Sequence, residues 1–505
     1  MVAFFVAMKY KKIILLLWIL SCFNVVSVAQ KNYHFTATCI QAYNDILQLK
    51  LHNGQQLLDK AKEENADNLI PYFLENYIDF LKLFFDENPV EYAQLKEAME
   101  QRLALLEKGN KQSAFYHYCL SQMQFHKTTV ALKFGEKWTG AWAFKRAFQH
   151  IKTGIKQHPD FGPNQLLYGS LQTIIGTLPK GYSFLAGLFG MKGTIPEGMQ
   201  RVRSFSNAND VWANIFKTEA IFIKSYLQFY IENKKEETLQ QIQQQKLDVV
   251  NNHLFAYMAA NLGLNYQMTD YARTVMSKRN QSAAYHRLVV WDYYEGIAAM
   301  QQLQLVEAAQ NLEQFLQHFK GNFYVKDAYL KLSWCYYLAG NKANAEKNKK
   351  LTLQKGNTYS DADAQAQKEA KLGYWPNAAL LKARILCDGG YFNEALKTAT
   401  ALKSEMLDKE EEKLELTYRL GRIYDELKKK QQALQYYIAT IESPNTTKTY
   451  FPARAALQAG YIYEQQGNKE EAIKYFNICL AMEGHAYKNS LDQKAKTGIL
   501  RCKGE

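Results

Sequence analysis

Apolar residues recur at three- and four-residue intervals along most of this chain, which is the spacing of helices that bury one face. The stretches with this pattern in the first half are 57–62, 71–85, 90–106, 114–134, 142–157 and 212–232. The last stretch is followed by a solvated run of lysine, glutamate and glutamine at 233–246. Alternating runs of β-branched residues are few, and proline occurs only nine times in 505 residues. The pattern therefore predicts an all-α protein.

A spaced pattern repeats through the second half and is clearest near the C-terminus. One copy consists of Leu420, Gly421, Tyr424, Ala433 and Tyr437, and the next, 39 residues on, of Ala459, Gly460, Tyr463, Ala472 and Phe476. A small residue lets two helices approach, and an aromatic side chain fills the gap beside it. Each copy therefore predicts a pair of packed helices.

The alanine of the second helix extends this register towards the N-terminus. The matching alanines are Ala272, Ala308, Ala345, Ala395, Ala433 and Ala472, with steps of 36, 37, 50, 38 and 39 residues. The long step contains a polar, turn-rich insertion at 355–361 before a helix. Pro376 then starts the next repeat, as expected for proline in a first helical turn.

This register resembles the tetratricopeptide (TPR) superfamily. The resemblance implies a helical-repeat solenoid, a superhelix of antiparallel helix pairs that binds a protein or peptide. A solenoid also accounts for a long chain without a clear linker, since each repeat contacts only its neighbours. The expected organisation is a signal peptide at 1–29, irregular helical repeats at 30–161, a glycine-rich hairpin at 162–200, a helical connector at 201–250 and TPR-like repeats at 251–505.

The repeat register assigns residues to a concave groove, because certain first-helix positions of TPR-like units line that face. They are Tyr293, Ile297, Leu330, Trp334, Tyr337, Arg384, Tyr418, Arg422, Arg454, Leu457 and Tyr461. Aromatic residues and arginine dominate binding hot spots, and this set suits an extended peptide or an anionic segment. The alternative is that several of these aromatics pack between repeats. A clamp for chaperone tails is not expected, because Arg422 and Tyr461 stand where asparagine would be needed.

A glycine-rich segment from 162 to 198 departs from the helical pattern, with eight glycines between apolar runs. Glycine costs about 1 kcal/mol per helical position relative to alanine, so close helix contact or a bend should offset it. In one interpretation the segment packs against the solenoid. In the other it exposes an apolar tip that touches a membrane or a partner. The tip would consist of Phe184, Leu185, Leu188, Phe189 and Met191.

The same segment carries a second, local resemblance. The residues that carry this resemblance are Gly169, Leu178-Pro179, Gly190, Gly193 and Gly198. They are similar to the signature of the eukaryotic TPR family that includes the inclusion-body-clearance protein of the mitochondrial outer membrane. The chain departs from that signature at Thr194-Ile195, where the family carries an acid–base pair. The resemblance implies a central glycine-rich hairpin and no catalytic residues.

Motifs for catalysis or cofactor binding do not appear in the sequence. No phosphate loop, H-E-x-x-H, G-x-S-x-G or paired Cys/His zinc spacing is present, so we expect no catalytic residue, cofactor or metal. His117 and His126 are nine residues apart, which does not suit a shared metal on one helix. The net charge is +13, but the basic residues alternate with acids along the helices, and no nucleic-acid partner is expected. An enzyme built on a helical toroid remains an alternative.

The N-terminus has the layout of an export signal. Lys9, Lys11 and Lys12 precede the apolar run 13–20, and Ser27-Val28-Ala29 has the form of a signal peptidase site. The mature chain would begin at Gln30 and act in the periplasm or at the outer membrane. A lipoprotein junction at Cys22 is the competing interpretation.

Overall fold

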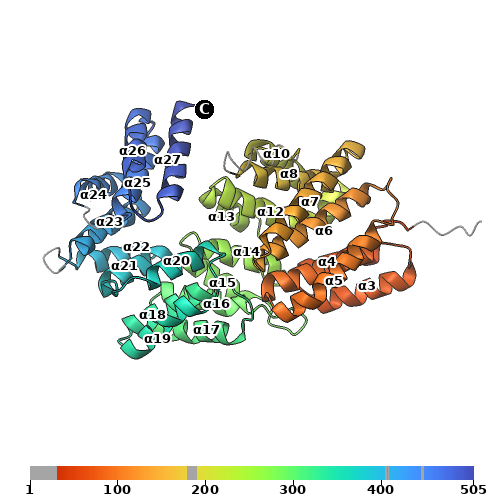
Figure 1. The fold of residues 1–505 in the computed structure, drawn as a ribbon, viewed down its shortest axis with the longest axis horizontal. Helices are drawn as coiled ribbons and strands as arrows, with labels where there is room; N and C mark the ends of the chain where they lie inside the picture. Colours follow the sequence, from red (N-terminus) through yellow and green to blue (C-terminus); the bar gives the residue numbers. More distant parts are fainter. Residues whose placement is uncertain (1–30, 179–189, 404–406, 408, 445–447, 505) are drawn as a thin grey trace, which may run out of the picture.

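The structure is a computed structural model that describes residues 31–178, 190–403, 407, 409–444 and 448–504. Helices follow one another along a curved path, from the N-terminal helices at one end to the C-terminal helices at the other (Figure 1). The first half contains α2 (Ala37–Leu47), α3 (Leu51–Glu64), α4 (Ile70–Asp86), α5 (Pro89–Leu106), α6 (Ala114–Lys133), α7 (Lys137–Gln157), α8 (Gly162–Gly176), α10 (Ile195–Ser206), α11 (Val211–Ile215), α12 (Lys217–Tyr226), a π-helical turn (Leu227–Ile231) and α13 (Lys235–Gln244). Within the described residues no β-strand forms, and the all-α prediction is confirmed.

Each predicted apolar stretch of the first half contains helix, but α2, α8 and α10 were not among those stretches, and two further details differ. The stretch 212–232 is interrupted at Phe216, which separates α11 from α12, and it ends in a π-helical turn. The polar run 233–246 contains a helix, α13, because Leu239 and Ile242 bury one side of it. A helix can therefore be mostly polar and still pack through a narrow apolar stripe.

The second half consists mainly of helix pairs in the predicted register. The pairs are α14 (His253–Leu264) with α15 (Thr269–Lys278), α16 (Val290–Gln301) with α17 (Leu305–His318), α18 (Val325–Leu338) with α19 (Lys342–Gln354), α21 (Ala378–Gly389) with α22 (Phe392–Thr400), α23 (Glu410–Glu426) with α24 (Lys430–Glu442), and α25 (Phe451–Gln465) with α26 (Lys469–Ala481), closed by α27 (Lys488–Lys503). All six register alanines lie on the second helix of a pair and are buried. The chain is therefore a helical-repeat solenoid.

Glycines on the first helices lie where the two helices of a pair approach each other. A Cβ added at Gly421 would stand 2.8 Å from the Tyr437 ring, and one at Gly460 would stand 2.5 Å from the Phe476 ring. Contacts this short are not found for real Cβ atoms. The small residue and the aromatic of the sequence pattern thus fit together as predicted.

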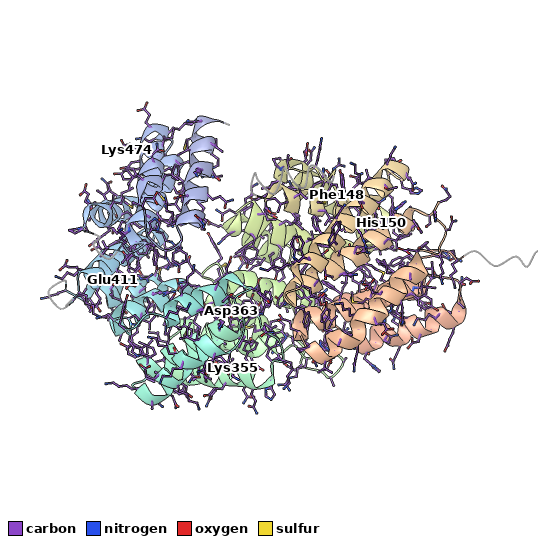
Figure 2. All side chains as sticks on the ribbon, viewed as in Figure 1. Phe148, His150, Lys355, Asp363, Glu411 and Lys474 are labelled. Carbon is purple, nitrogen blue, oxygen red and sulfur yellow. The ribbon has the colours of Figure 1, made fainter. Side chains whose placement is uncertain are left out.

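The 50-residue step forms an additional helix, α20 (Asp361–Ala370), which changes how the repeats stack. This helix packs on α18 and α19, while α21 packs on α16. Asp363 of α20 accepts hydrogen bonds from the backbone N–H groups of Tyr324 (2.8 Å) and Asp327 (3.1 Å) at the start of α18. Figure 2 places Asp363 near the middle of the molecule. The prediction for Pro376 was wrong by two residues, since Asn377 caps α21 and the proline lies before it.

The described glycines of the glycine-rich segment bring α8 and α10 into backbone contact. A Cβ at Gly169 would stand 2.7 Å from the Gly198 carbonyl oxygen, and one at Gly193 would stand 2.6 Å from the Gln172 Cα. Close helix contact therefore offsets the helix-breaking tendency of these glycines. Residues 179–189 lie outside the described residues, and the local resemblance to the mitochondrial family stays a prediction.

The hydrophobic core is one large cluster from residue 33 to residue 385, followed by smaller clusters around α21–α27. Polar contacts also join the two halves. His286 Nε2 lies 2.8 Å from a carboxylate oxygen of Asp86, and Glu87 accepts hydrogen bonds from the backbone N–H groups of Asn322 and Phe323, both at 3.1 Å. The six described cysteines are buried and unbridged.

Candidate partner-binding pocket

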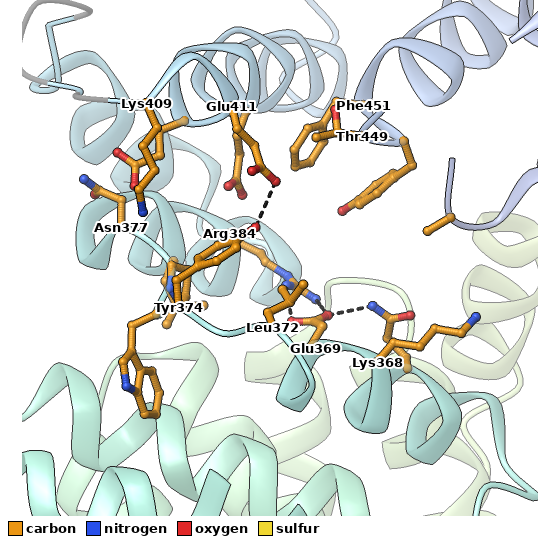
Figure 3. Close-up of a pocket in the computed structure, with 18 of the residues that line it drawn as sticks. Lys368, Glu369, Leu372, Tyr374, Asn377, Arg384, Lys409, Glu411, Thr449 and Phe451 are labelled. Carbon is orange, nitrogen blue, oxygen red and sulfur yellow. Dashed lines mark hydrogen bonds and ion pairs between the residues drawn. The ribbon is translucent and has the colours of Figure 1, made fainter. Parts of the chain in front are cut away.

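A pocket of about 370 Å³ opens where the inserted helix α20 interrupts the regular stacking of repeats. Residues from α18, α19, α20, α21, α23 and the start of α25 line it, together with the segments that precede α21, α23, α25 and α27. Figure 3 shows that side chains from these separate elements converge on one space. Helix α20 packs against α18, while α21 packs on α16. The pocket lies between α20 and α21, and side chains rather than another helix line it.

An arginine held in a fixed orientation forms the floor of the pocket. The Arg384 guanidinium donates two hydrogen bonds of 3.0 Å to the two carboxylate oxygens of Glu369, and it lies 5.0 Å from the Trp334 ring centroid. Gln365 donates a further hydrogen bond of 2.8 Å to Glu369. Burial alone would raise the pKa of Glu369, but the adjacent guanidinium holds it at about 2. The cluster is therefore an ion pair at neutral pH, with the geometry of a fork on a carboxylate.

Two further arginines extend this network along α23. Arg422 lies 2.7 Å from a carboxylate oxygen of Asp388, whose other oxygen lies 3.8 Å from Arg384 Nε. Arg419 donates to Glu415 at 2.6 Å. Burial opposes ionisation of Asp388, but the surrounding arginines lower its pKa below the usual value. These pairs hold the arginine side chains in place and neutralise most of their charge.

Aromatic side chains from the segment before α21 line one wall. Trp375 stacks on Tyr337 with 4.5 Å between ring centroids, and the Tyr337 hydroxyl donates to the Pro376 carbonyl at 2.9 Å. The Tyr374 hydroxyl donates to Glu411 at 3.0 Å, and that ring is 39 % exposed. Tyr337 thus anchors the segment, while Tyr374 presents its ring at the mouth.

A second, more open hollow continues from the first. The two share Gln365, Lys368, Arg384, Tyr450 and Tyr487. The second hollow adds Arg454 and Lys488, and Asp361 is its only acidic lining residue. Together they form a groove, which we call the α20 groove, with aromatics and acids at one end and the exposed side chains of Lys368 and Arg454 at the other.

The structure brings together only part of the groove predicted from the register. Trp334, Arg384 and Leu330 line the first hollow, and Arg454 lines the second. Other predicted residues pack between helices. These residues are buried or half-buried: Tyr293, which is hydrogen-bonded to Asp327, Ile297, Tyr418, which packs against Phe451, Leu457, and Tyr461, which packs against Phe476. Arg422 is paired with Asp388, and Tyr337 supports the segment before α21.

The repeat register missed several lining residues because they lie outside it. Lys368 and Glu369 belong to the inserted helix, and Tyr374, Tyr450 and Tyr487 lie on segments between helices. The irregular 50-residue step was the available signal, since an insertion on the surface of a repeat protein is where binding residues collect.

The predicted apolar tip lies almost entirely outside the described residues. Phe184, Leu185, Leu188 and Phe189 fall within 179–189, and Met191 is half-buried against the main core. The export signal and Cys22 also precede the first described residue. Across the described part of the chain, no three His, Cys, Asp or Glu side chains gather in a way that could hold a metal ion.

Comparison with known proteins identifies the repeats. The family model described as tetratricopeptide repeat matches residues 414–443 and 453–488, which cover α23 to α26 and the approach to α27. Among curated proteins, no sequence matches the chain. The class defined by fold and sequence is thus a helical-repeat protein, and its C-terminal repeats are tetratricopeptide repeats, as the register predicted.

Solved structures with similar folds include a human IFIT1 dimer with PPP-AAAA, which shares 14 % identity over 89 % of this chain and 97 % of that one, with a TM-score of 0.33. Yeast Tom70 shares 12 % identity over 91 % of this chain and 96 % of that one, with a TM-score of 0.23. The Cut9–Hcn1 hetero-tetramer of the APC/C shares 11 % identity over 92 % and 95 %, with a TM-score of 0.26.

Proposed function

We propose that this protein is an exported, non-catalytic scaffold that binds an extended segment of a partner protein in the α20 groove. The observation that carries the proposal is the continuity of the two hollows around Arg384, where a fixed guanidinium, aromatic rings and exposed cations face one elongated space. Tetratricopeptide repeats supply the rigid frame, and a preorganised groove lowers the ordering cost of association.

The groove chemistry indicates which peptide would fit. The end near Lys368 and Arg454 is exposed and basic, so it would attract an acidic side chain or a C-terminal carboxylate. The end near Tyr374 and Trp334 offers aromatic surface for an apolar side chain. The expected ligand is therefore a short segment with an apolar anchor and a nearby negative charge.

The test is selection of peptides from a random displayed library on the full chain, followed by affinity measurement with fluorescence anisotropy. Reversing two exposed groove charges, Lys368→Glu with Arg454→Glu, should weaken binding of acidic peptides by at least about tenfold. The matched control is Lys278→Glu with Lys397→Glu, which reverses two exposed charges on second helices. Equal loss in both variants, or selected peptides indifferent to both, would refute the groove assignment.

A further inference from the structure

Helix α7 exposes two tryptophans on one face. Trp138 is 82 % exposed and Trp142 is 53 % exposed, and their four-residue spacing places them on the same side of the helix. The opposite side is buried against α6 and α8 through Ala143, Ala147 and Ile151. Figure 2 labels Phe148 and His150 on this helix. Such exposure is unusual, because tryptophan side chains are mostly buried in folded proteins.

The same helix carries only positive charge. Its 21 residues include Lys137, Lys145, Arg146, Lys152 and Lys156, and no aspartate or glutamate. Lys137, Arg146, Lys152 and Lys156 are exposed, and the ammonium group of Lys145 lies 4.8 Å from the Trp142 ring centroid.

The acid next to this helix in the chain does not neutralise it. Glu136, immediately before α7, is paired with Lys96 of α5 at 2.7 Å. The neighbouring helix α6 carries lysines and no acid as well, so this part of the chain is basic.

The neighbouring helix α6 also exposes a leucine. Leu132 of α6 is 49 % exposed, and it lies so close to Gly140 that a Cβ there would stand 3.1 Å from it. Indoles beside cations are typical of helices that lie in the headgroup region of a membrane.

We propose that the exposed face of α7 docks on an anionic lipid surface. Trp138 and Trp142 would enter the headgroup region, and the cations along the rest of the helix would contact lipid phosphates. Charge complementarity carries the choice of occupant, since each Lys or Arg near an anionic membrane adds attraction and no acid on α7 opposes it. Over the described residues no helix has the length and hydropathy needed to cross a bilayer.

A nucleic acid would also meet these cations, but it fits the arrangement less well. Single strands bind where aromatic rings follow the path of successive bases. Here the two indoles lie near the start of α7, while the cations continue to its end. This arrangement favours insertion of the indoles at the start of α7 into a lipid surface, with electrostatic contact between lipid phosphates and the cations along the rest of the helix.

The experiment is co-sedimentation of the full chain with vesicles of phosphatidylcholine alone or with phosphatidylglycerol added, at two salt concentrations. We expect binding only to the anionic vesicles, weakened by salt and accompanied by a blue shift of tryptophan emission. The variant Arg146→Gln, Lys152→Gln, Lys156→Gln should bind at least about tenfold more weakly. The variant Trp138→Ala, Trp142→Ala should also bind more weakly and should lose the blue shift.

The control variant Lys342→Gln, Lys347→Gln, Lys350→Gln removes three exposed cations from α19 and should bind like the wild type. Circular dichroism and melting temperature establish that each variant is folded. The proposal is overturned if the wild type ignores anionic vesicles, if the α7 variants bind as well as the control, or if a single-stranded DNA binds more tightly than the vesicles. Loss on Leu188→Asp with Phe189→Asp, without loss in the α7 variants, assigns lipid contact to the glycine-rich segment and also overturns the proposal.

Discussion

Single side chains decide how closely the helices of this solenoid approach. The Phe476 ring lies between two glycines, Gly460 of α25 and Gly498 of α27, and a Cβ added at either would stand within 2.6 Å of ring atoms. The ring is therefore held between α25 and α27. The aromatic of one repeat thus fixes the spacing to its own partner helix and to the next helix of the stack.

Replacing Gly460 with alanine should destabilise the protein by about 1–3 kcal/mol, because the added methyl group overpacks the site. The measurement is the free energy of unfolding in urea. Gly373→Ala is the control, since a Cβ there meets nothing within 4 Å and its backbone is not left-handed. An equal effect of the two substitutions would mean that contact with Phe476 does not decide the result.

Ion pairing at Glu369 should make the free energy of unfolding depend on pH in the acidic range. The folded pKa of about 2 lies below the ordinary value of 4.5, so the pair stabilises fully above pH 4.5 and this contribution is lost as the pH falls towards 2. The loss amounts to about 3 kcal/mol, since each pKa unit corresponds to 1.36 kcal/mol. Unfolding of the wild type and of Glu369→Gln, compared between pH 6 and pH 3, should show a smaller decrease in the variant. Parallel curves would contradict the assignment.

At the scale of elements, the inserted helix α20 stabilises the start of α18, which precedes it in the chain. Asp363 accepts hydrogen bonds from two backbone N–H groups at the start of α18, where Tyr324 has a left-handed conformation with φ of 66°. The insertion therefore caps α18 as well as lining the groove. Burial raises the pKa of Asp363 to about 6, despite these donors.

Replacing Asp363 with alanine should cost about 1–3 kcal/mol of stability, because buried backbone donors lose their acceptor. Thermal unfolding is the measurement, and Asp361→Ala, an exposed substitution in the same helical turn, is the control. Hydrogen exchange should also accelerate at the first turn of α18 in the Asp363 variant only. Protection that is unchanged there would argue against a capping role.

At the scale of the whole molecule, repeats that are distant in the chain contact each other. The Gln267 side chain, between α14 and α15, donates to Glu426 at the end of α23 at 2.9 Å. The Tyr391 hydroxyl, before α22, donates to Asp270 of α15 at 2.5 Å. In a simple solenoid each repeat contacts only its neighbours. Here the superhelix also closes across several repeats, which should increase cooperativity.

Gly390 tests that closure, since a Cβ there would stand 2.0 Å from the Gln267 carbonyl oxygen and its φ is +91°. Gly390→Ala should separate the α21–α22 turn from the α14–α15 turn that contains Gln267. It should also lower stability and broaden the unfolding transition. Gly340→Ala is the matched control, with φ of +81° but nothing within 4 Å, so it isolates backbone strain from the contact. Small-angle X-ray scattering should show a larger radius of gyration for the Gly390 variant alone. Identical profiles would mean that the closure does not hold the shape.

The amino-acid sequence by itself determined the helical class, most helix positions in the first half and the register of the repeats. These follow from local periodicity and from small residues facing aromatic ones, which are properties of neighbours in the chain. The groove depended on the tertiary structure. Because α20 displaces α21 onto α16, residues such as Lys368, Tyr450 and Tyr487 meet Arg384 from outside the repeat register. Which aromatics pack inside and which remain accessible is decided by contacts between elements distant in the chain, and no local pattern encodes them.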